Sequence, residues 1–164
     1  MAQEAIYFGD AHWQGNTGAG KGPWVGADLE AGMFYGGGNA TKLSPTNKPL
    51  TSPFVSLHLK GRTDGFALRG ADATSGRLET MYDGPRPDHR SAPNNCHWHG
   101  VNGSYQPMRK QGAIILGTGG DNSNGAIGSF YEGYIASGVS SAATDDQIQK
   151  NIIAVGYKSA VETI

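Results

Sequence analysis

The sequence of 164 residues has a single cysteine, no long apolar run and no excess of basic residues. The one cysteine, Cys96, excludes an internal disulfide framework. No apolar run approaches the ~18–20 residues of a membrane-spanning helix, and the first residues lack the basic and apolar regions of a signal peptide. With 13 Lys and Arg against 14 Asp and Glu, the formal charge is −1. This balance argues against nucleic acid or an anionic membrane as a partner.

Glycine, by contrast, is abundant, with 26 of the 164 residues. This is more than twice the ~7% of average usage, and it follows no collagen-like period. Glycine at this level indicates many tight turns and close backbone approaches. With 3 Trp, 7 Tyr and 5 Phe as core material, the composition and length predict one all-β domain over residues 1–164.

Short segments bounded by turn residues predict seven or eight strands, the number typical of a β-sandwich. In 54–60 the even-numbered positions share one face, and the odd-numbered positions, all aliphatic, share the other. The stretch 61–65 (GRTDG) predicts a hairpin turn. The strand at 112–116 is the most apolar and is expected to be central. The expected strands are 5–9, one or two within 24–35, 54–60, 65–69, 77–82, 112–116 and 127–136.

Only the C-terminal region has a helical pattern. The run 144–147 (TDDQ) has the form of a capping box with Thr144 as the N-cap. Apolar residues then recur at helical spacing at Ile148, Ile152 and Val155. Gly156 is expected to end this helix.

The segment 83–107 has four prolines and no period, and at 25 residues it is long for a structureless loop. It contains three side chains that can bind metals, Cys96, His97 and His99, around Trp98. A structural zinc site usually needs four ligands at defined spacing, and no second ligand cluster is evident. A cluster without a metal is the better interpretation, and Trp98 could instead stack on a sugar ring.

Two separate segments carry carboxylates suited to chemistry. Asp28 and Glu30 would share one face of a strand, and such close like charges are expected on a solvent-facing edge or in an active site. Asp121 and Asn122 lie in GGDNSNG, where glycines allow close approach of a ligand; the alternative is a polar turn. Glycoside hydrolysis needs two carboxyl groups with aromatic faces nearby. These residues therefore predict a carbohydrate-active β-sandwich.

Six runs resemble, in the same order, parts of the catalytic domain of fungal-type α-L-arabinofuranosidase B. The resemblance is therefore to enzymes of the glycoside hydrolase family 54 type. The resemblance extends to the helical end at 143–157 and covers nearly the whole chain, as the C-terminal half of that domain. The runs are EAIYFG (4–9), GPWVGADLE (22–30), RGADATS (69–75), GPRP (84–87), KQGAIILGTGGDNSN (110–124) and GSFYEG (128–133).

The resemblance implies a concanavalin-like β-sandwich (jelly roll) of short antiparallel strands. It implies removal of terminal α-L-arabinofuranosyl groups from arabinoxylan or arabinan, with retention of configuration and no metal or other cofactor. Glu30 would be the nucleophile and Asp121 the general acid/base. The family is typically extracellular. The expected sugar-binding residues are Trp13, Asp28 and Gly120, with Asn122 added for its amide chemistry.

Other readings remain open at this point. The same fold serves non-catalytic carbohydrate-binding or self-assembling modules, and a related glycosidase could act on another sugar. The family domain has an upstream half that this sequence does not contain. Half of a sandwich can leave an apolar face or unpaired edges. A compact sandwich is expected, with a homo-oligomer or a separate N-terminal half as alternative partners.

Overall fold

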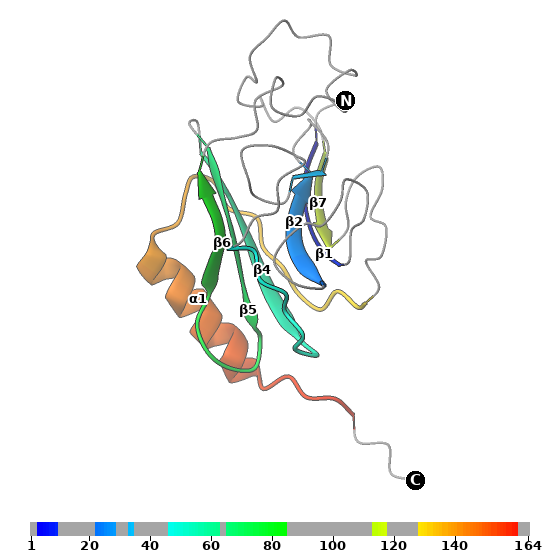
Figure 1. Ribbon diagram of the computed structural model, residues 1–164. Helices are drawn as coiled ribbons and strands as arrows, with labels where there is room; N and C mark the ends of the chain where they lie inside the picture. The colour runs from blue at the N-terminus through cyan, green and yellow to red at the C-terminus, as the bar shows by residue number, and fades with distance from the viewer. Residues whose placement is uncertain are drawn as a thin grey trace, which may run out of the picture.

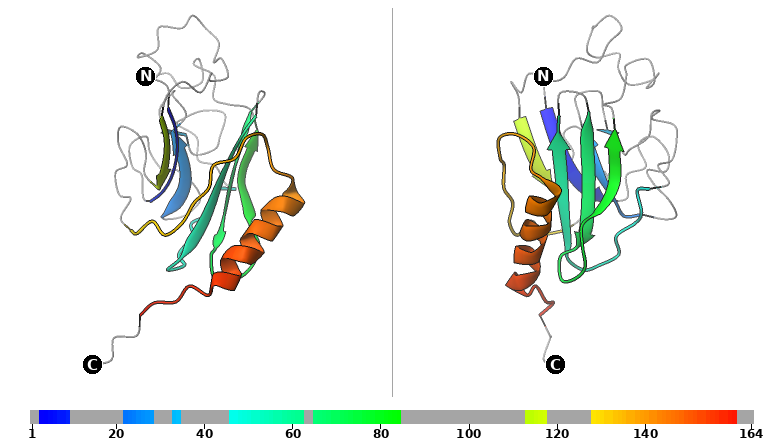
Figure 2. Two further views of the ribbon diagram at one scale, coloured as in Figure 1. Left: turned by 180° about the vertical axis from the view of Figure 1, so that it is seen from behind. Right: turned by 90° about the vertical axis from the view of Figure 1, so that its left-hand side faces the viewer.

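Seven strands and one helix make up the described part of the chain (Figure 1). The computed structural model describes residues 3–9, 22–28, 33–34, 46–62, 65–84, 113–117 and 128–160. The elements are β1 (Gln3–Gly9), β2 (Trp24–Asp28), β3 (Met33–Phe34), β4 (Val55–Gly61), β5 (Phe66–Asp72), β6 (Glu79–Gly84), β7 (Ala113–Gly117) and α1 (Ala142–Val155). Their strands stack as two sheets, with α1 on the outer side of one of them (Figure 2).

One sheet has the strand order β3-β2-β1-β7 and the other β4-β5-β6. All pairings are antiparallel except that of β1 with β7, which is parallel. The expectation of antiparallel strands throughout is therefore wrong for this pair. β7 follows the whole second sheet in sequence, so no hairpin constrains its direction, and a long crossover permits the parallel arrangement.

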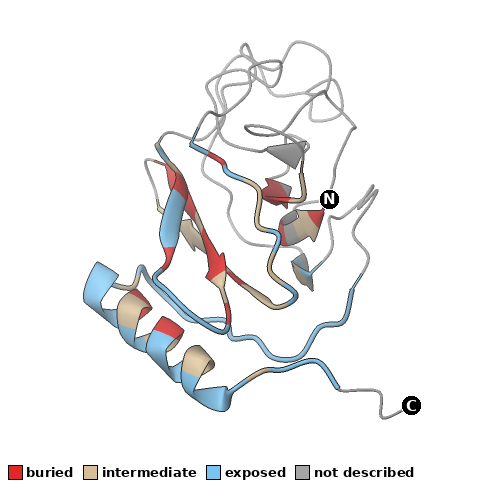
Figure 3. Ribbon diagram, turned by 60° about the horizontal axis from the view of Figure 1, so that its bottom comes forward, coloured by how far each residue is buried: buried red, intermediate tan, exposed pale blue. Residues whose placement is uncertain are grey.

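The core lies between the two sheets and is apolar. Alternation places Ile6, Val25 and Ala27 on the inner face of one sheet, against Phe66 and Leu68 of the other. Figure 3 shows buried positions on strands of both sheets. The two faces predicted for strand 54–60 are confirmed, because its odd-numbered leucines pack against this core. The fold is thus the expected β-sandwich.

The hairpin of β4 and β5 is also confirmed. The strands pair in register from Gly61 opposite Phe66 to Val55 opposite Asp72. The N–H of Arg62 donates to the carbonyl of Gly65 at 2.9 Å, which closes the hairpin.

The helix α1 begins three residues earlier than the capping-box pattern predicts. Ser141 is the N-cap, and its side chain accepts a hydrogen bond from the Thr144 N–H at 3.1 Å. The end is as predicted, with Gly156 in the left-handed region at φ 76° and its N–H bonded to the Ile153 carbonyl. Among the described residues, no helix has the length and apolar character to cross a membrane.

The strand expected at 127–136 is not found. Within 128–136 the structure has no strand, and the large apolar side chains there are exposed, Phe130 by 61% and Ile135 by 64%. Alternating apolar residues can pair as a strand only where a neighbouring edge bonds to their backbone. None of the described strands does so here.

Candidate active site

The predicted nucleophile segment begins with the last residue of β2. Asp28 is the last residue of this strand, and it pairs with Ala5 of β1 on one side and Met33 of β3 on the other. Its backbone is therefore fixed between two neighbouring strands. Glu30, two residues further on, lies outside the described residues, as does Trp13.

The predicted acid/base segment follows β7. This strand pairs in parallel with β1, from Gln3 opposite Ala113 to Tyr7 opposite Gly117. Contrary to expectation, β7 is the last strand of its sheet in the described structure, and Ile114 is 44% exposed. An apolar strand can lie at an edge where further apolar groups cover it. Gly120, Asp121 and Asn122 lie outside the described residues.

β1 relates the two segments to one another. Ala5 of β1 pairs with both Asp28 and Ile115, and Tyr7 pairs with both Gly26 and Gly117. Because β2 runs antiparallel and β7 parallel to β1, the two strands point in opposite directions (Figure 1), and their last residues lie opposite β1 residues that are two positions apart, Ala5 and Tyr7. Of the six predicted site residues, the structure places only the backbone of Asp28, and their convergence stays a prediction.

A buried charged cluster lies between α1 and the outer face of the β4-β5-β6 sheet, the face turned away from the other sheet. The carboxylate of Asp145 on α1 is fully buried and accepts hydrogen bonds from Lys60 at 2.6 Å and Arg69 at 2.7 Å. Ser140 donates to its other oxygen. Burial by itself raises the pKa of Asp145, but the hydrogen bonds from Lys60, Ser140 and Arg69 hold it below its ordinary value. A carboxylate that stays ionised and has its charge balanced by two cations is suited to holding α1 in place rather than to acid/base chemistry.

His58 lies beside this cluster on β4 and is 5% exposed. Its Nδ1 is 3.5 Å from the Tyr134 hydroxyl, and its Nε2 is buried with no hydrogen-bond partner among the described residues. Burial lowers the pKa of His58, an effect that Asp145 opposes and that Arg69 and Lys60 reinforce. His58 is therefore neutral at neutral pH.

Sequence reasoning did not single out this cluster. The available signal was the polar face of 54–60, which required a polar partner once its aliphatic face entered the core. In the described part of the chain, no group of three His, Cys, Asp or Glu residues could hold a metal ion. The Cys96, His97, Trp98 and His99 cluster lies outside the described residues.

Comparison with known proteins places this architecture in a family. Residues 1–158 match the family model described as "Alpha-L-arabinofuranosidase B, catalytic". The chain is 49% identical over 160 residues to an "Alpha-L-arabinofuranosidase" from Hypocrea jecorina. It is 48% identical, also over 160 residues, to an "Arabinofuranosidase/B-xylosidase" from Trichoderma koningii. Each match covers 96% of this chain but 28% of the relative, so the chain spans under a third of their length.

Solved structures agree with this match. A variant of a GH54 α-L-arabinofuranosidase soaked with 4-nitrophenyl α-L-arabinofuranoside superposes with a TM-score of 0.70 at 40% identity. The superposition covers 94% of this chain and 29% of the GH54 chain. An arabinofuranosidase complexed with arabinofuranosyl-α-1,2-xylobiose superposes with a TM-score of 0.69 at 38% identity, covering 93% and 28%.

Proposed function

Because the chain belongs to the α-L-arabinofuranosidase B catalytic family, we propose that it hydrolyses terminal α-L-arabinofuranosyl groups with retention of configuration. The observation that carries the proposal is the family match over residues 1–158, which includes every described strand and α1. The proposed substrate is arabinoxylan or arabinan, which is consistent with the arabinofuranosyl-xylobiose held by a matched structure. Since these are polymers, we place the activity outside the cell.

The proposed mechanism uses two carboxyl groups in two steps. The Glu30 carboxylate attacks the anomeric carbon while Asp121 gives its proton to the departing glycosidic oxygen, which leaves an arabinosyl ester on Glu30. Asp121 then takes a proton from water, the water oxygen attacks the anomeric carbon, and Glu30 leaves as a carboxylate. Retention requires the two carboxyl groups to be about 5–5.5 Å apart.

The remaining site residues are proposed to hold the sugar. Asp28, with its backbone held at the end of β2, would accept hydrogen bonds from sugar hydroxyls two residues before the nucleophile. Trp13 would offer an aromatic face, Gly120 would allow close backbone approach, and Asn122 would add an amide donor and acceptor. All chemical steps are assigned to Glu30 and Asp121.

Hydrolysis of 4-nitrophenyl α-L-arabinofuranoside tests the proposal, with Glu30→Gln and Asp121→Asn beside the wild type and Asp146→Asn as the control. Asp146 lies on α1 and has no proposed role. We expect Glu30→Gln to lose turnover and Asp146→Asn to keep it. On arabinoxylan, the rate of hydrolysis by Asp121→Asn should fall about 10²–10⁴-fold. Nitrophenolate leaves without a proton, so on the nitrophenyl substrate this variant should stall at the ester and regain turnover with azide.

A folded wild-type chain that is inert on both substrates would contradict the proposal. Binding of arabinoxylan without turnover would then favour a carbohydrate-binding module.

A second activity, on β-D-xylosides, is favoured by the name of the Trichoderma koningii relative, "Arabinofuranosidase/B-xylosidase". If one site performs both reactions, Glu30→Gln should abolish hydrolysis of 4-nitrophenyl β-D-xylopyranoside together with that of the arabinofuranoside. Xylosidase activity that survives in Glu30→Gln would contradict a shared site.

A further inference from the structure

The two sheets have unequal numbers of strands, and the difference leaves a gap on one side. β1 packs over β4 and β2 over β5. β7 lies next to β1 on the side away from β2, so it extends one strand beyond β4 (Figure 2). In the described structure, no strand lies beside β4 in the position opposite β7.

The backbone of β4 presents hydrogen-bonding groups to this gap. Ala73 N–H donates to the Phe54 carbonyl and Arg62 N–H to the Gly65 carbonyl. In an antiparallel pair, alternate residues bond to the neighbouring strand. The even-numbered residues of β4 therefore bond to β5, and Val55, Leu57, Leu59 and Gly61 direct their N–H and C=O groups to the open side. No backbone hydrogen bond between β4 and residues 128–140 is found in the described structure.

The gap is part of a groove of about 1070 Å³ that is lined by β4, β7 and residues 128–140 and that extends to residues 52–54 and to α1. Its walls include Leu57, Leu59 and Leu116, with Ile114 and Ile135 at its opening, 44% and 64% exposed. This volume slightly exceeds the ~300–1,000 Å³ typical of small-molecule sites. An apolar groove bordered by an unpaired strand edge has the features of a site for strand addition.

We propose that a separate segment of polypeptide binds in this groove as a fourth strand of the β4-β5-β6 sheet. Its backbone pairs with β4, and apolar side chains at alternate positions cover Ile114 and Leu116 of β7. The natural candidates are segments like those that the relatives carry in the part of their chains outside the match, which is more than two thirds of their length. The proposal does not depend on the enzymatic activity.

A second copy of this chain fits the groove less well. In a twofold dimer, two β4 edges would pair antiparallel about an axis perpendicular to the sheet. The β4 strand of the partner would then lie under β7. The β1 strand of the partner packs over the partner's β4. The partner's β1 and the β7 of this copy would therefore compete for the same space.

Co-expression tests the proposal. The 164-residue chain would be produced with the portions of the Hypocrea jecorina relative that lie outside the matched 160 residues, each as a separate tagged chain. We expect a one-to-one complex by analytical ultracentrifugation. In that complex, amide exchange at Val55, Leu57 and Leu59 should slow at least tenfold. Exchange at Ser56 and His58, whose N–H groups already bond to β5, should change little.

Lysine substitutions at the groove provide the matched comparison. Ile114→Lys and Ile135→Lys should each weaken the complex at least tenfold, because a charge enters the apolar groove. Val155→Lys, at a 54% exposed position on α1 that does not line the groove, should leave the complex intact. Unchanged protection of the β5 amides would establish that each variant is folded.

Three outcomes would overturn the proposal. They are a folded chain that binds none of these portions, a complex without protection of the odd-numbered β4 amides, and a homodimer that protects the same amides. The last result would assign the groove to a second copy.

Discussion

The β4-β5-β6 sheet packs against a layer on each of its faces, the other sheet on one side and α1 on the other (Figure 2). The inner face contributes apolar residues such as Phe66, Leu68 and Met81, all fully buried. The outer face contacts α1 through polar groups, and the buried residues of the helix are Asp145 and Gln149. The first contact is driven by removal of apolar surface from water, and the second depends on matched hydrogen bonds and charges.

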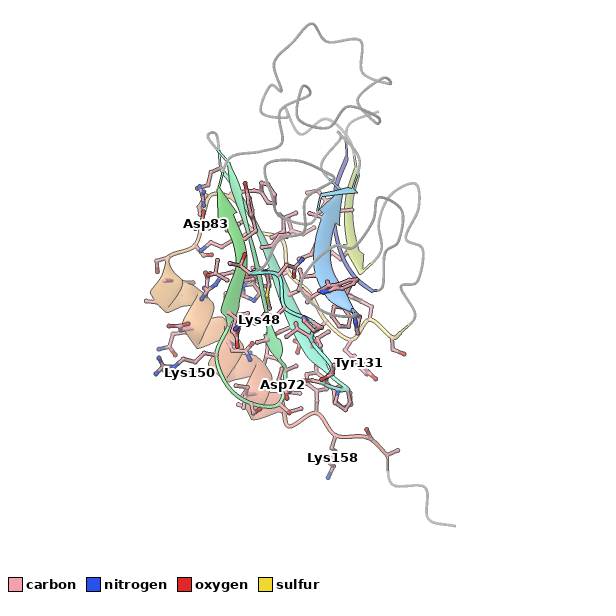
Figure 4. The ribbon with its side chains drawn as sticks, viewed as in Figure 1. Lys48, Asp72, Asp83, Tyr131, Lys150 and Lys158 are labelled. Carbon is pink, nitrogen blue, oxygen red and sulfur yellow. The ribbon has the colours of Figure 1, made fainter. Side chains whose placement is uncertain are left out.

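The polar contact is well matched. Gln149 donates to the Asp72 carbonyl at 2.8 Å and accepts from the Ser56 hydroxyl at 2.6 Å. Lys150, by contrast, extends from α1 away from the sheet (Figure 4). Buried ion pairs gain little over apolar packing but are costly to break. The sandwich should therefore be more sensitive to lost volume, and the helix contact to lost charge.

The largest effect is expected from Phe66→Ala. Phe66 is fully buried and packs against Tyr82, with ring centroids 4.8 Å apart. The cavity and the lost apolar contact should lower the free energy of unfolding by about 3–5 kcal/mol, measured by urea denaturation. Phe130→Ala, at a position 61% exposed, should cost less than about 0.5 kcal/mol. Equal effects would show that the inner contact does not dominate stability.

Asp145→Asn should cost about 3 kcal/mol, because it leaves the Lys60 and Arg69 charges, 15% and 14% exposed, without their counter-ion. Asp146→Asn makes the same chemical change one residue away on α1 and should have a small effect. The measurement is again urea denaturation, with amide exchange of α1 to locate the loss. A small loss for Asp145→Asn would mean that the two cations find other partners or water.

Lowering the pH is expected to have an intermediate effect on the stability of the fold. The pKa of His58 is below its ordinary 6.5 in the folded state, so the unfolded chain binds a proton first, and stability should fall as pH drops below about 6.5. The pKa of Asp145 is also lowered from 3.8, so its contribution is present above that pH and is lost as pH falls further.

His58→Gln separates the two contributions. Thermal unfolding between pH 8 and pH 3 should show a smaller loss of stability near pH 6 in this variant than in the wild type, while the loss at lower pH remains. If the two profiles have the same shape near pH 6, His58 is not the titrating group.

The smallest effect is expected from Ser141→Ala. This substitution removes the N-cap acceptor of the Thr144 N–H and should cost about 1 kcal/mol. Ser159→Ala, beyond the helix, is the matched control and should be neutral in urea denaturation. If Ser141→Ala is also neutral, the polar contact of α1 with the sheet outweighs its cap.

Local patterns predicted most of the elements, apart from the strand at 127–136 and the start of α1, and predicted the contacts of α1 poorly. Alternation in 54–60 identified β4 and its two faces, and Gly156 marked the end of α1. The periodic Ile148, Ile152 and Val155 nevertheless do not form the buried face of the helix, and Val155 is 54% exposed. The face of the helix that is buried depends on what the sheet presents, and residues 54–60 already present their polar side chains outward.

The candidate site was predicted less from physics than from resemblance. Paired carboxylates and a glycine-rich polar loop pointed to Asp28, Glu30 and Asp121, but only the resemblance assigned their roles. The structure adds the position of the Asp28 backbone between β1 and β3. The mutual distance of the two proposed catalytic carboxyl groups depends on residues outside the described part of the chain.

The sequence by itself determined the approximate positions of the seven observed strands, the β4–β5 hairpin and the end of the helix, because these depend on the conformations and alternation of neighbouring residues. It also predicted a strand at 127–136, and residues 128–136 form none. Only the tertiary structure decided the parallel pairing of β1 with β7, the edge position of β7 among the described strands and the polar contact of α1. Each of these joins segments far apart in the chain. Their free energy depends on which surfaces meet, and local sequence patterns do not encode that choice.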